Sequence, residues 1–393
     1  MQPNIPRSLR HHIHELARYY PAISLTGPRQ AGKTTLARTM FPDYRYVNFE
    51  DIRQRERFES DPQGFLTTYD ERVIFDEAQR VPELFNYLLV EIDERRTPGR
   101  FVLTGSQNFL AMKNITQSLA GRVGIARLLP LDFSEVDTPA LAEAGPAAAM
   151  LRGFYPGPYQ SGIPPRIYYS DYLASYLERD VTHLIKQSNM LDYRRFLTLV
   201  VSMIGQPLNY STLAGTLRVT VNTIKQWVHY LDQTYIAFLV SPYFANTGKR
   251  VAKRPKLFFY DTGLACFLSG LETEAALEAS PQYGNLFENM VIADVRKQRY
   301  HAGDLSHFSF YRDERQREVD FVDQTINAKW AMEIKSSDNP RPGHVSAARK
   351  IKALLDADLR LSLTYGGRDH RVIDGVPANP WFDWSGAGAK SEA

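Results

Sequence analysis

The chain has 393 residues, 44% hydrophobic and 23% charged, the ordinary composition of a soluble globular protein with room for two or three domains. Its net charge of +3 does not by itself predict nucleic-acid binding, so any basic surface would be local. Cys266 is the only cysteine, which excludes an intrachain disulfide, and the first twenty residues lack the apolar core of a signal peptide. The apolar runs are too short to span a bilayer, so we expect a cytoplasmic protein with no membrane partner.

A phosphate-binding loop follows the first predicted strand, the apolar residues 22–25. The next residues match the pattern G-x-x-x-x-G-K-[ST] and open a predicted helix. In such a loop the backbone N–H groups surround phosphate oxygens, Lys33 reaches the β- and γ-phosphates, and Thr34 ligates Mg²⁺. The predicted ATP-binding residues are Gly27, Pro28, Arg29, Gln30, Ala31, Gly32, Lys33, Thr34 and Thr35.

A pair of acids about fifty residues later fits the same chemistry. The apolar residues 73–75 predict a buried strand that ends in Asp76 and Glu77. In a P-loop protein the first acid of such a pair holds Mg²⁺, and the second orients and polarises the attacking water. We therefore predict Asp76 as a metal ligand and Glu77 as a catalytic residue.

Further strands are predicted at 44–50, 100–106 and 124–131, separated by helical segments. This alternation predicts an α/β domain with a parallel sheet whose two faces are covered. Ser106, at the end of the strand after the acid pair, is predicted to sense the γ-phosphate, with Gln107 and Asn108 as alternatives. Arg122 is either an arginine finger or a surface arginine in a turn.

Four segments carry a family resemblance: "LTGPRQAGKTTLA", "VIFDEAQ", "VLTGSQNF" and "SLAGRV…LLPLDFSE". In this order they resemble the prokaryotic AAA+-type ATPases related to the archaeal and STAND clades, over roughly residues 5–135. The resemblance implies ATP binding and hydrolysis with Mg²⁺, an adenine-nucleotide switch and homo-oligomerisation. Members often carry a C-terminal domain of unknown function, which the segments "YLERDV", "NLFENMV", "EVDFV" and "EIKSS" also resemble.

The middle of the chain predicts a winged helix-turn-helix. Residues 136–165 are rich in Ala, Pro and Gly, which is typical of a connector. A short helix capped by Ser211, a turn and a helix over 221–231 follow, and then the segments "YIAFLV" and "KLFFYD" form a hairpin.

The hairpin connection is basic. Its cationic residues would either lie along the phosphates of DNA or face solvent on a winged helix that packs against the ATPase core. These residues are Lys249, Arg250, Lys253, Arg254 and Lys256.

The last third contains four residues with metal-site spacing. Glu288 shares the apolar face of a predicted helix with Val291, Ile292 and Val295, where an unpaired acid would be costly. A hairpin over 318–335, expected at a sheet edge, carries Asp320 on its first strand and Glu333 and Lys335 on its second. Without a site, this polar face would simply be solvated.

The order of these elements is similar to the PD-(D/E)XK nuclease superfamily over roughly residues 283–370. The resemblance implies that Glu288, Asp320 and Glu333 hold Mg²⁺ or Mn²⁺, and that Lys335 positions or activates water for phosphodiester cleavage.

The sequence thus predicts an AAA+-like domain (1–150), a connector with a winged helix (151–262), a PD-(D/E)XK-like domain (263–376) and a disordered tail (377–393). The expected function is ATP hydrolysis coupled to an action on DNA or RNA, with metal-dependent cleavage by the C-terminal domain. One alternative is a non-nucleolytic ATP switch whose C-terminal domain binds nucleic acid or a protein. Another is a nuclease whose P-loop binds ATP only as a structural clamp.

Overall fold

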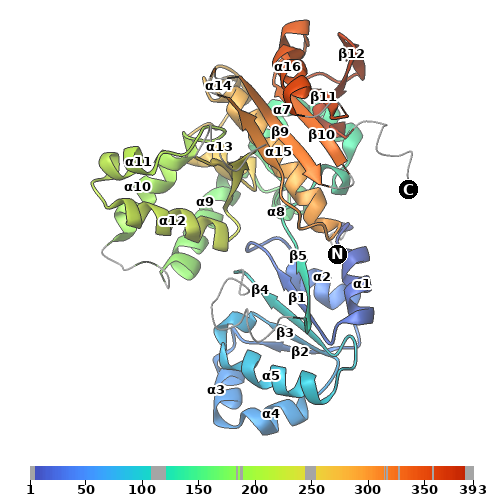
Figure 1. Cartoon of the computed structure of the whole chain (residues 1–393). Helices are drawn as coiled ribbons and strands as arrows, with labels where there is room; N and C mark the ends of the chain where they lie inside the picture. Colours follow the sequence, from blue (N-terminus) through green and yellow to red (C-terminus); the bar gives the residue numbers. More distant parts are fainter. Residues whose placement is uncertain are drawn as a thin grey trace.

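The computed structural model describes residues 5–107, 121–182, 185, 189–243, 254–313, 315, 317–325, 328–355 and 358–385. A P-loop domain lies at one end of the molecule, a group of helices at its side, and a second α/β part at the other end (Figure 1). Among the helices within these ranges, none combines the length and apolar character needed to cross a membrane.

The P-loop domain is built on a five-stranded sheet in the order β2-β3-β4-β1-β5. All neighbouring strands are parallel, so the predicted covered parallel sheet is confirmed. Its strands are β1 (Ala22–Thr26), β2 (Arg45–Asn48), β3 (Val73–Asp76), β4 (Phe101–Gly105) and β5 (Val123–Arg127). Its helices are α1 (Arg10–Tyr19), α2 (Lys33–Met40), α3 (Ile52–Ser60), α4 (Pro62–Thr68), the 3₁₀ turn η1 (Ala78–Arg80) and α5 (Glu83–Glu94).

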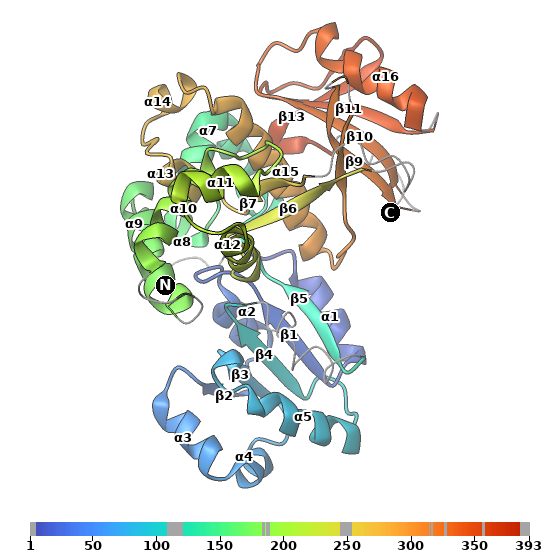
Figure 2. The ribbon, with the colours of Figure 1, turned by 60° about the vertical axis from the view of Figure 1, so that its left-hand side comes forward.

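Side chains of one strand enter two different cores because successive residues point to opposite faces. In β3, Val73 and Phe75 join a cluster with α5, whereas Ile74 joins a cluster with α1 and α2. Helices cover both faces of this sheet (Figure 2). The parallel register brings the carboxyl ends of β1, β3 and β4 to one edge, where the P-loop begins.

The middle part is helical, and the expectation of a connector over 136–165 is wrong. Asp137 caps the first helix by accepting a hydrogen bond from the N–H of Ala140. The chain kinks at Gly145, where φ is +84°, and Pro146 then begins a second helical segment that buries Met150. The middle helices are α7 (Thr138–Arg152), α8 (Pro156–Gln160), α9 (Pro165–Tyr176), the π-helix η4 (Leu177–Val181), α10 (Met190–Val201), α11 (Tyr210–Leu217), α12 (Val221–Gln233), α13 (Thr262–Leu268) and α14 (Glu274–Glu278).

The two helices predicted at 211–231 are present as α11 and α12. The cap of α11 is Asn209 rather than Ser211, because the Asn209 side chain accepts from the N–H of Thr212. Thr220 caps α12 in the same way.

A second sheet has the order β12-β13-β11-β10-β9-β8-β6-β7. The predicted hairpin of β6 and β7 is antiparallel, but β6 also pairs in parallel with β8. The expected boundary after residue 262 therefore does not separate two independent sheets. The strands are β6 (Ala237–Pro242), β7 (Lys256–Phe259), β8 (Ser309–Arg312), β9 (Glu318–Thr325), β10 (Ala328–Lys335), β11 (Arg360–Tyr365), β12 (Arg371–Ile373) and β13 (Val376–Pro380).

The C-terminal part is completed by α15 (Tyr283–His301) and α16 (Ser346–Leu355). The predicted hairpin of β9 and β10 is antiparallel, and it lies in the middle of the sheet rather than at an edge. The predicted disordered tail is wrong over 377–385, because β13 ends at Pro380 and Trp381 is fully buried. Residues 386–393 lie outside the described residues.

Candidate functional site

The phosphate-binding loop is shaped by two glycines. At Gly27 a Cβ atom would lie only 1.9 Å from the carbonyl oxygen of Leu128, so the loop passes too close to the end of β5 for any side chain. Gly32 precedes α2 with a φ of +94°, a conformation that L-residues rarely adopt. The N-terminus of α2 therefore faces the loop, as the chemistry of phosphate binding requires.

Lys33 and Thr34 open α2 beside the acids of β3. The ammonium of Lys33 donates to the carbonyl oxygens of Gly27 and Pro28 at 3.0 and 2.8 Å. Burial lowers the pKa of Lys33, although the charges of Glu77 and Asp76 oppose this shift. An anion beside Lys33 would restore the stability of its charged form.

Asp76 is buried at the carboxyl end of β3. Its carboxylate accepts hydrogen bonds from Thr34 Oγ1 at 3.0 and 3.2 Å, from the Tyr46 hydroxyl at 2.5 Å, and from Thr104 Oγ1. Hydroxyl and carboxylate oxygens are ligands that Mg²⁺ prefers, so Thr34 and Asp76 are suited to bind the ion that a P-loop requires.

Glu77 has a left-handed backbone conformation, and its side chain is fixed by hydrogen bonds. Its φ of 55° and ψ of 43° are left-handed, which aims its side chain away from the direction of the strand. The carboxylate accepts from the side-chain amide of Gln79 at 2.5 Å and lies 3.3 Å from Ser106 Oγ. Ser106 therefore contacts Glu77 in this structure, and Gln79 is a partner that the sequence reasoning missed.

Arg122 lies at the wrong end of the sheet to serve its own P-loop. It directly precedes β5, whose first residue, Val123, pairs with Ala22 at the start of β1, whereas the P-loop follows the end of β1. Arg122 also forms an ion pair with Asp93 of α5 at 2.8 Å. Arg122 therefore lies away from the P-loop of its own chain, which favours the surface-arginine alternative. Asn108, an alternative to Ser106, lies outside the described residues.

The middle part contacts the P-loop through two residues that the sequence reasoning did not single out. Arg29 Nε donates to Asp180, a buried residue of the π-helix η4, at 2.7 Å. The hydroxyl of Tyr235, just before β6, lies 2.7 Å from Thr26 Oγ1 at the end of β1. Asp180 lies in the "YLERDV" segment that carries part of the family resemblance, and Tyr235 begins the segment "YIAFLV" that was predicted as a strand. The π-helix around Asp180 is a rare element that is frequent at functional sites.

A buried arginine connects the P-loop to the segment after β5. Arg7 donates to the carbonyl oxygens of Ala31 and Leu129, both at 2.7 Å, and its Nε lies 3.1 Å from a carboxylate oxygen of Glu135. Nearby, His301 of α15 is bonded to Asp132 at 2.6 Å through Nδ1 and faces the N–H of Leu129 through Nε2. Asp132, Glu135 and His301 form an acidic cluster. Because both ring nitrogens of His301 make hydrogen bonds within the protein, we assign this cluster a structural role.

The C-terminal carboxylates form a second candidate site. Glu288 of α15 and Glu318 and Asp320 of β9 each place one oxygen so that all three atoms lie within 4.8 Å of one another. Glu333 joins this group through Lys335, whose ammonium lies 2.6 Å from Glu333 and 3.6 Å from Asp320. The structure therefore brings together the four predicted residues and adds Glu318.

The low exposure of these acids decides between a site and a solvated hairpin face. Asp320 is 7% exposed and Glu333 is 6% exposed, which excludes the solvated alternative. Within the described part of the chain, Glu333 Oε2 has no hydrogen-bond partner. A buried carboxylate oxygen without a partner is costly and is an acceptor available to a cation.

The crowded acids take up protons. Burial raises the pKa of Glu288 to about 7, with a further rise from Asp320, and Lys256 opposes both. Burial and the charge of Asp320 raise the pKa of Glu333 to about 8, against the effect of Lys335. Burial and the repulsion between the acids therefore outweigh the attraction of Lys256 and Lys335 at these two carboxyls.

One predicted cation of the hairpin has a different role from the one expected. Lys256 is 1% exposed, and its ammonium lies 2.9 Å from Glu288 and 2.5 Å from Glu318. It cannot lie along DNA phosphates, so that interpretation is wrong for this residue. Arg254 is exposed, and Lys249, Arg250 and Lys253 lie outside the described residues.

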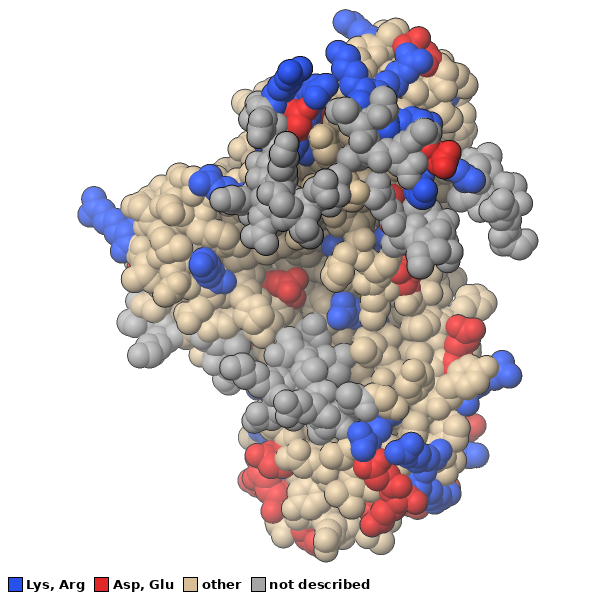
Figure 3. All heavy atoms as spheres, in the orientation of Figure 1, with Lys and Arg blue, Asp and Glu red and all other residues tan. Residues whose placement is uncertain are grey.

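The surface carries charge unevenly. On the face drawn in Figure 3, Lys and Arg side chains gather over the C-terminal end, whereas acidic and basic side chains are intermixed on the P-loop domain. A mild net charge thus coexists with a local basic region.

Three family models match the chain. An AAA domain matches residues 19–137, and two domains of unknown function, DUF8612 and DUF4143, match residues 146–275 and 283–382. The uncharacterized proteins Rv2008c of Mycobacterium tuberculosis and Mb2031c of Mycobacterium bovis are each 31% identical over 369 residues, which is 92% of this chain and 80% of theirs.

Two solved structures are also similar. A Walker-type ATPase of Pyrococcus abyssi has a TM-score of 0.39 at 16% identity, with 66% of this chain and 94% of that chain covered. A STAND protein of Pyrococcus horikoshii with a tetratricopeptide repeat sensor has a TM-score of 0.26 at 13% identity, with 78% and 49% covered.

Proposed function

Since the chain belongs to the family of its two mycobacterial relatives and contains an AAA domain, we propose that it hydrolyses ATP and acts on nucleic acid through a metal-dependent C-terminal site. The reducing cytoplasm is the expected setting, because Cys266 is buried and unpaired. The observation that carries the C-terminal half of this proposal is the convergence of Glu288, Glu318 and Asp320, to which Lys335 links Glu333.

For ATP, the P-loop backbone and Lys33 would bind the phosphates, and Thr34 and Asp76 would hold Mg²⁺. The ion would neutralise charge on the phosphates. Glu77 orients the attacking water and takes its proton, once its carboxylate is no longer bonded to Gln79. Ser106 is well placed to report this change because it touches both Glu77 and Gln79.

Homo-oligomerisation remains part of the proposal. A P-loop site is accelerated by a cation that stabilises the charge of the transition state, and a neighbouring subunit commonly supplies it. Arg122 could act only in this way, since it lies at the opposite edge of the sheet from its own P-loop.

At the C-terminal site, a divalent ion would supply the positive charge that the acids lack. Mg²⁺ and Mn²⁺ bind carboxylate oxygens, and the unpartnered Glu333 Oε2 offers one such oxygen. Lys335, whose side chain is 35% exposed, would face the phosphodiester and the water beside it. Asp320 is fixed by the backbone N–H of Ile334 at 2.8 Å, which orients its other oxygen. The basic surface at this end favours a nucleic-acid partner.

The experiment is a divalent-ion titration of the full chain by calorimetry, followed by incubation with Mg²⁺ or Mn²⁺ and DNA or RNA. We expect ion binding and cleavage in the wild type and loss of both in Asp320→Asn, with ATP binding retained. The exposed Asp338→Asn, just after β10, is the matched control and should behave as wild type. Ion binding in Asp320→Asn equal to that of the wild type would remove Asp320 from the site.

The same titration should depend on pH in a stated direction. The pKa values of Glu288 and Glu333 are raised to about 7 and about 8, so protons compete with the ion below these values. Ion affinity should therefore rise as the pH increases from below 7 and level off above 8. Because the folded state holds protons that the unfolded state releases near 4.5, the ion-free fold loses stability as the pH rises from 4.5 through the raised pKa values of about 7 and about 8. An affinity that is constant over this range would contradict the assignment of these two ligands.

A specific observation favours the non-nucleolytic switch as a second candidate. Lys256 and Lys335 already neutralise part of the carboxylate cluster. In that case the C-terminal part would bind nucleic acid or a protein partner without cleaving it. Binding of DNA or RNA that responds to ATP, with no cleavage in either metal, would support this alternative.

A further inference from the structure

The carboxylate site contains a cation supplied by the protein itself. The ammonium of Lys256 lies between Glu288 and Glu318, at 2.9 and 2.5 Å. These two acids and Asp320 are the residues whose oxygens lie close enough to one another to share one ion. A lysine ammonium and a divalent ion would therefore compete for the same carboxylate groups.

Lys256 does not come from the helix and hairpin that carry the acids. It begins β7, which follows α12 and β6 in the chain and precedes α13, α14 and α15. On one side the N–H of Leu208 donates to the carbonyl of Pro255 at 2.8 Å, and the N–H of Gly205 donates to that of Leu257 at 3.3 Å. The segment between α10 and α11 thus holds β7 beside the site.

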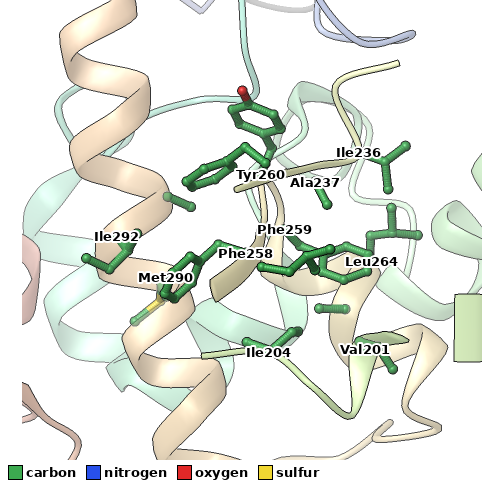
Figure 4. Packing of buried hydrophobic residues seen from close by; sticks show 14 of the residues in the cluster. Val201, Ile204, Ile236, Ala237, Phe258, Phe259, Tyr260, Leu264, Met290 and Ile292 are labelled. Carbon is green, nitrogen blue, oxygen red and sulfur yellow. The ribbon is translucent and has the colours of Figure 1, made fainter. Parts of the chain in front are cut away.

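The other side of β7 is fixed to α15. The backbone of Phe259 exchanges two hydrogen bonds with the side chain of Asn289, at 2.7 and 3.0 Å. Phe258 and Phe259 lie among the side chains of Met290 and Ile204 (Figure 4). Lys256 therefore stands on a strand that cannot shift without breaking buried contacts.

The middle part also closes over Glu288. Gly205 has a φ of +70°, and a Cβ atom there would lie 3.1 Å from the second carboxylate oxygen of Glu288. The side chain of Glu288 is only 12% exposed, so the loop at Gly205 and the ammonium of Lys256 together shield it from water. An incoming hydrated ion would have to displace both.

We propose that Lys256 is an internal counter-ion that weakens the binding of divalent metal at the carboxylate site, so that the middle part of the chain acts as a latch on this site. This inference rests on the proposed metal-dependent function and adds its regulation. The site would bind its ion more tightly when the ammonium of Lys256 leaves the carboxylates. Since β7 pairs with β6, and Tyr235 just before β6 contacts Thr26 beside the P-loop, the latch is connected to the nucleotide site.

The test compares Mn²⁺ binding by calorimetry in the full chain and in Lys256→Met. Removing a positive charge that competes for the same carboxylate groups and repels the ion should tighten Mn²⁺ binding by at least about tenfold. Lys256→Arg keeps the charge and is the matched control, with affinity expected at or below that of the wild type. Asp320→Asn reports whether the binding measured belongs to this site.

The outcomes separate the latch from the site. If Lys256→Met and the wild type bind Mn²⁺ equally, and Asp320→Asn does not bind, the latch is wrong and the metal site stands. If neither the wild type nor Lys256→Met binds Mn²⁺, the metal-dependent function fails and the latch fails with it. Tighter binding in Lys256→Arg would also overturn the latch.

Two further measurements test the proposal if Lys256→Met does not fold. Lys256→Gln removes the charge with a polar chain, and its melting temperature should rise more with Mn²⁺ than that of the wild type. In the wild type, acetylation of Lys256 should increase when Mn²⁺ is added, whereas the buried Lys297, which donates to the carbonyl of Leu131, should not change. Acetylation of Lys256 that stays constant while Mn²⁺ binds would overturn the proposal.

Discussion

Replacing Glu77 by Gln should lower the turnover of ATP by about 10²–10⁴-fold, the usual contribution of a general base. Glutamine keeps the size of the side chain and an oxygen that can accept from Gln79 and Ser106, so the fold around β3 should be unchanged. Phosphate and metal contacts are made by Lys33, Thr34 and Asp76, so the affinity for ATP should stay within about threefold of the wild type.

The measurement is steady-state phosphate release together with equilibrium binding of a fluorescent ATP analogue. Glu83→Gln, an exposed acid in the first turn of α5, is the matched control and should keep wild-type turnover. Turnover in Glu77→Gln equal to that of the wild type would remove Glu77 from the mechanism.

Arg7→Ala should reduce the free energy of unfolding by about 3–5 kcal/mol, the usual cost of removing one partner from a buried ion pair. The substitution leaves the carbonyl oxygens of Ala31 and Leu129 without this donor and leaves the buried carboxylate of Glu135 without its cation. Because Ala31 belongs to the P-loop, the affinity for ATP should fall as well.

The check is urea denaturation followed by circular dichroism. Arg10→Ala, an exposed substitution in α1, should change stability by less than about 0.5 kcal/mol. The stability of Arg7→Lys should lie between those of Arg7→Ala and Arg10→Ala, because one ammonium cannot replace a guanidinium that contacts three groups. Equal stability of the Arg7 and Arg10 alanine variants would show that the buried network contributes little.

The first domain was predictable because its signals are local. The P-loop pattern, the acid pair and the apolar strands each lie within a few residues, and a parallel sheet then brings their ends to one edge. The positions of Gly27, Lys33, Thr34 and Asp76 follow from that argument. Gln79 does not, because its contact with Glu77 depends on the left-handed turn at residue 77.

The later parts depended on contacts between distant residues. The sequence shows Lys256 as one of five cations in a basic run. Only the fold reveals its acid partners, which lie 32 and 62 positions further along the chain. The tail resembled a disordered segment because composition does not reveal that Trp381 packs at a right angle to Phe133. The segment 136–165 resembled a connector because of its Ala, Pro and Gly content, whereas Pro146 begins a helical segment after the kink at Gly145.

At position 77 the residue that is best for stability differs from the residue that is needed for catalysis, because the backbone there is left-handed. A left-handed conformation costs an ordinary residue about 1–2 kcal/mol, whereas asparagine adopts it with less strain. Glu77→Asn should therefore raise the midpoint of urea denaturation while abolishing turnover, and an unchanged or lowered midpoint would show that the turn is not strained. If the midpoint rises, the most stable sequence at this position is an inactive one, and glutamate persists there only under selection for hydrolysis.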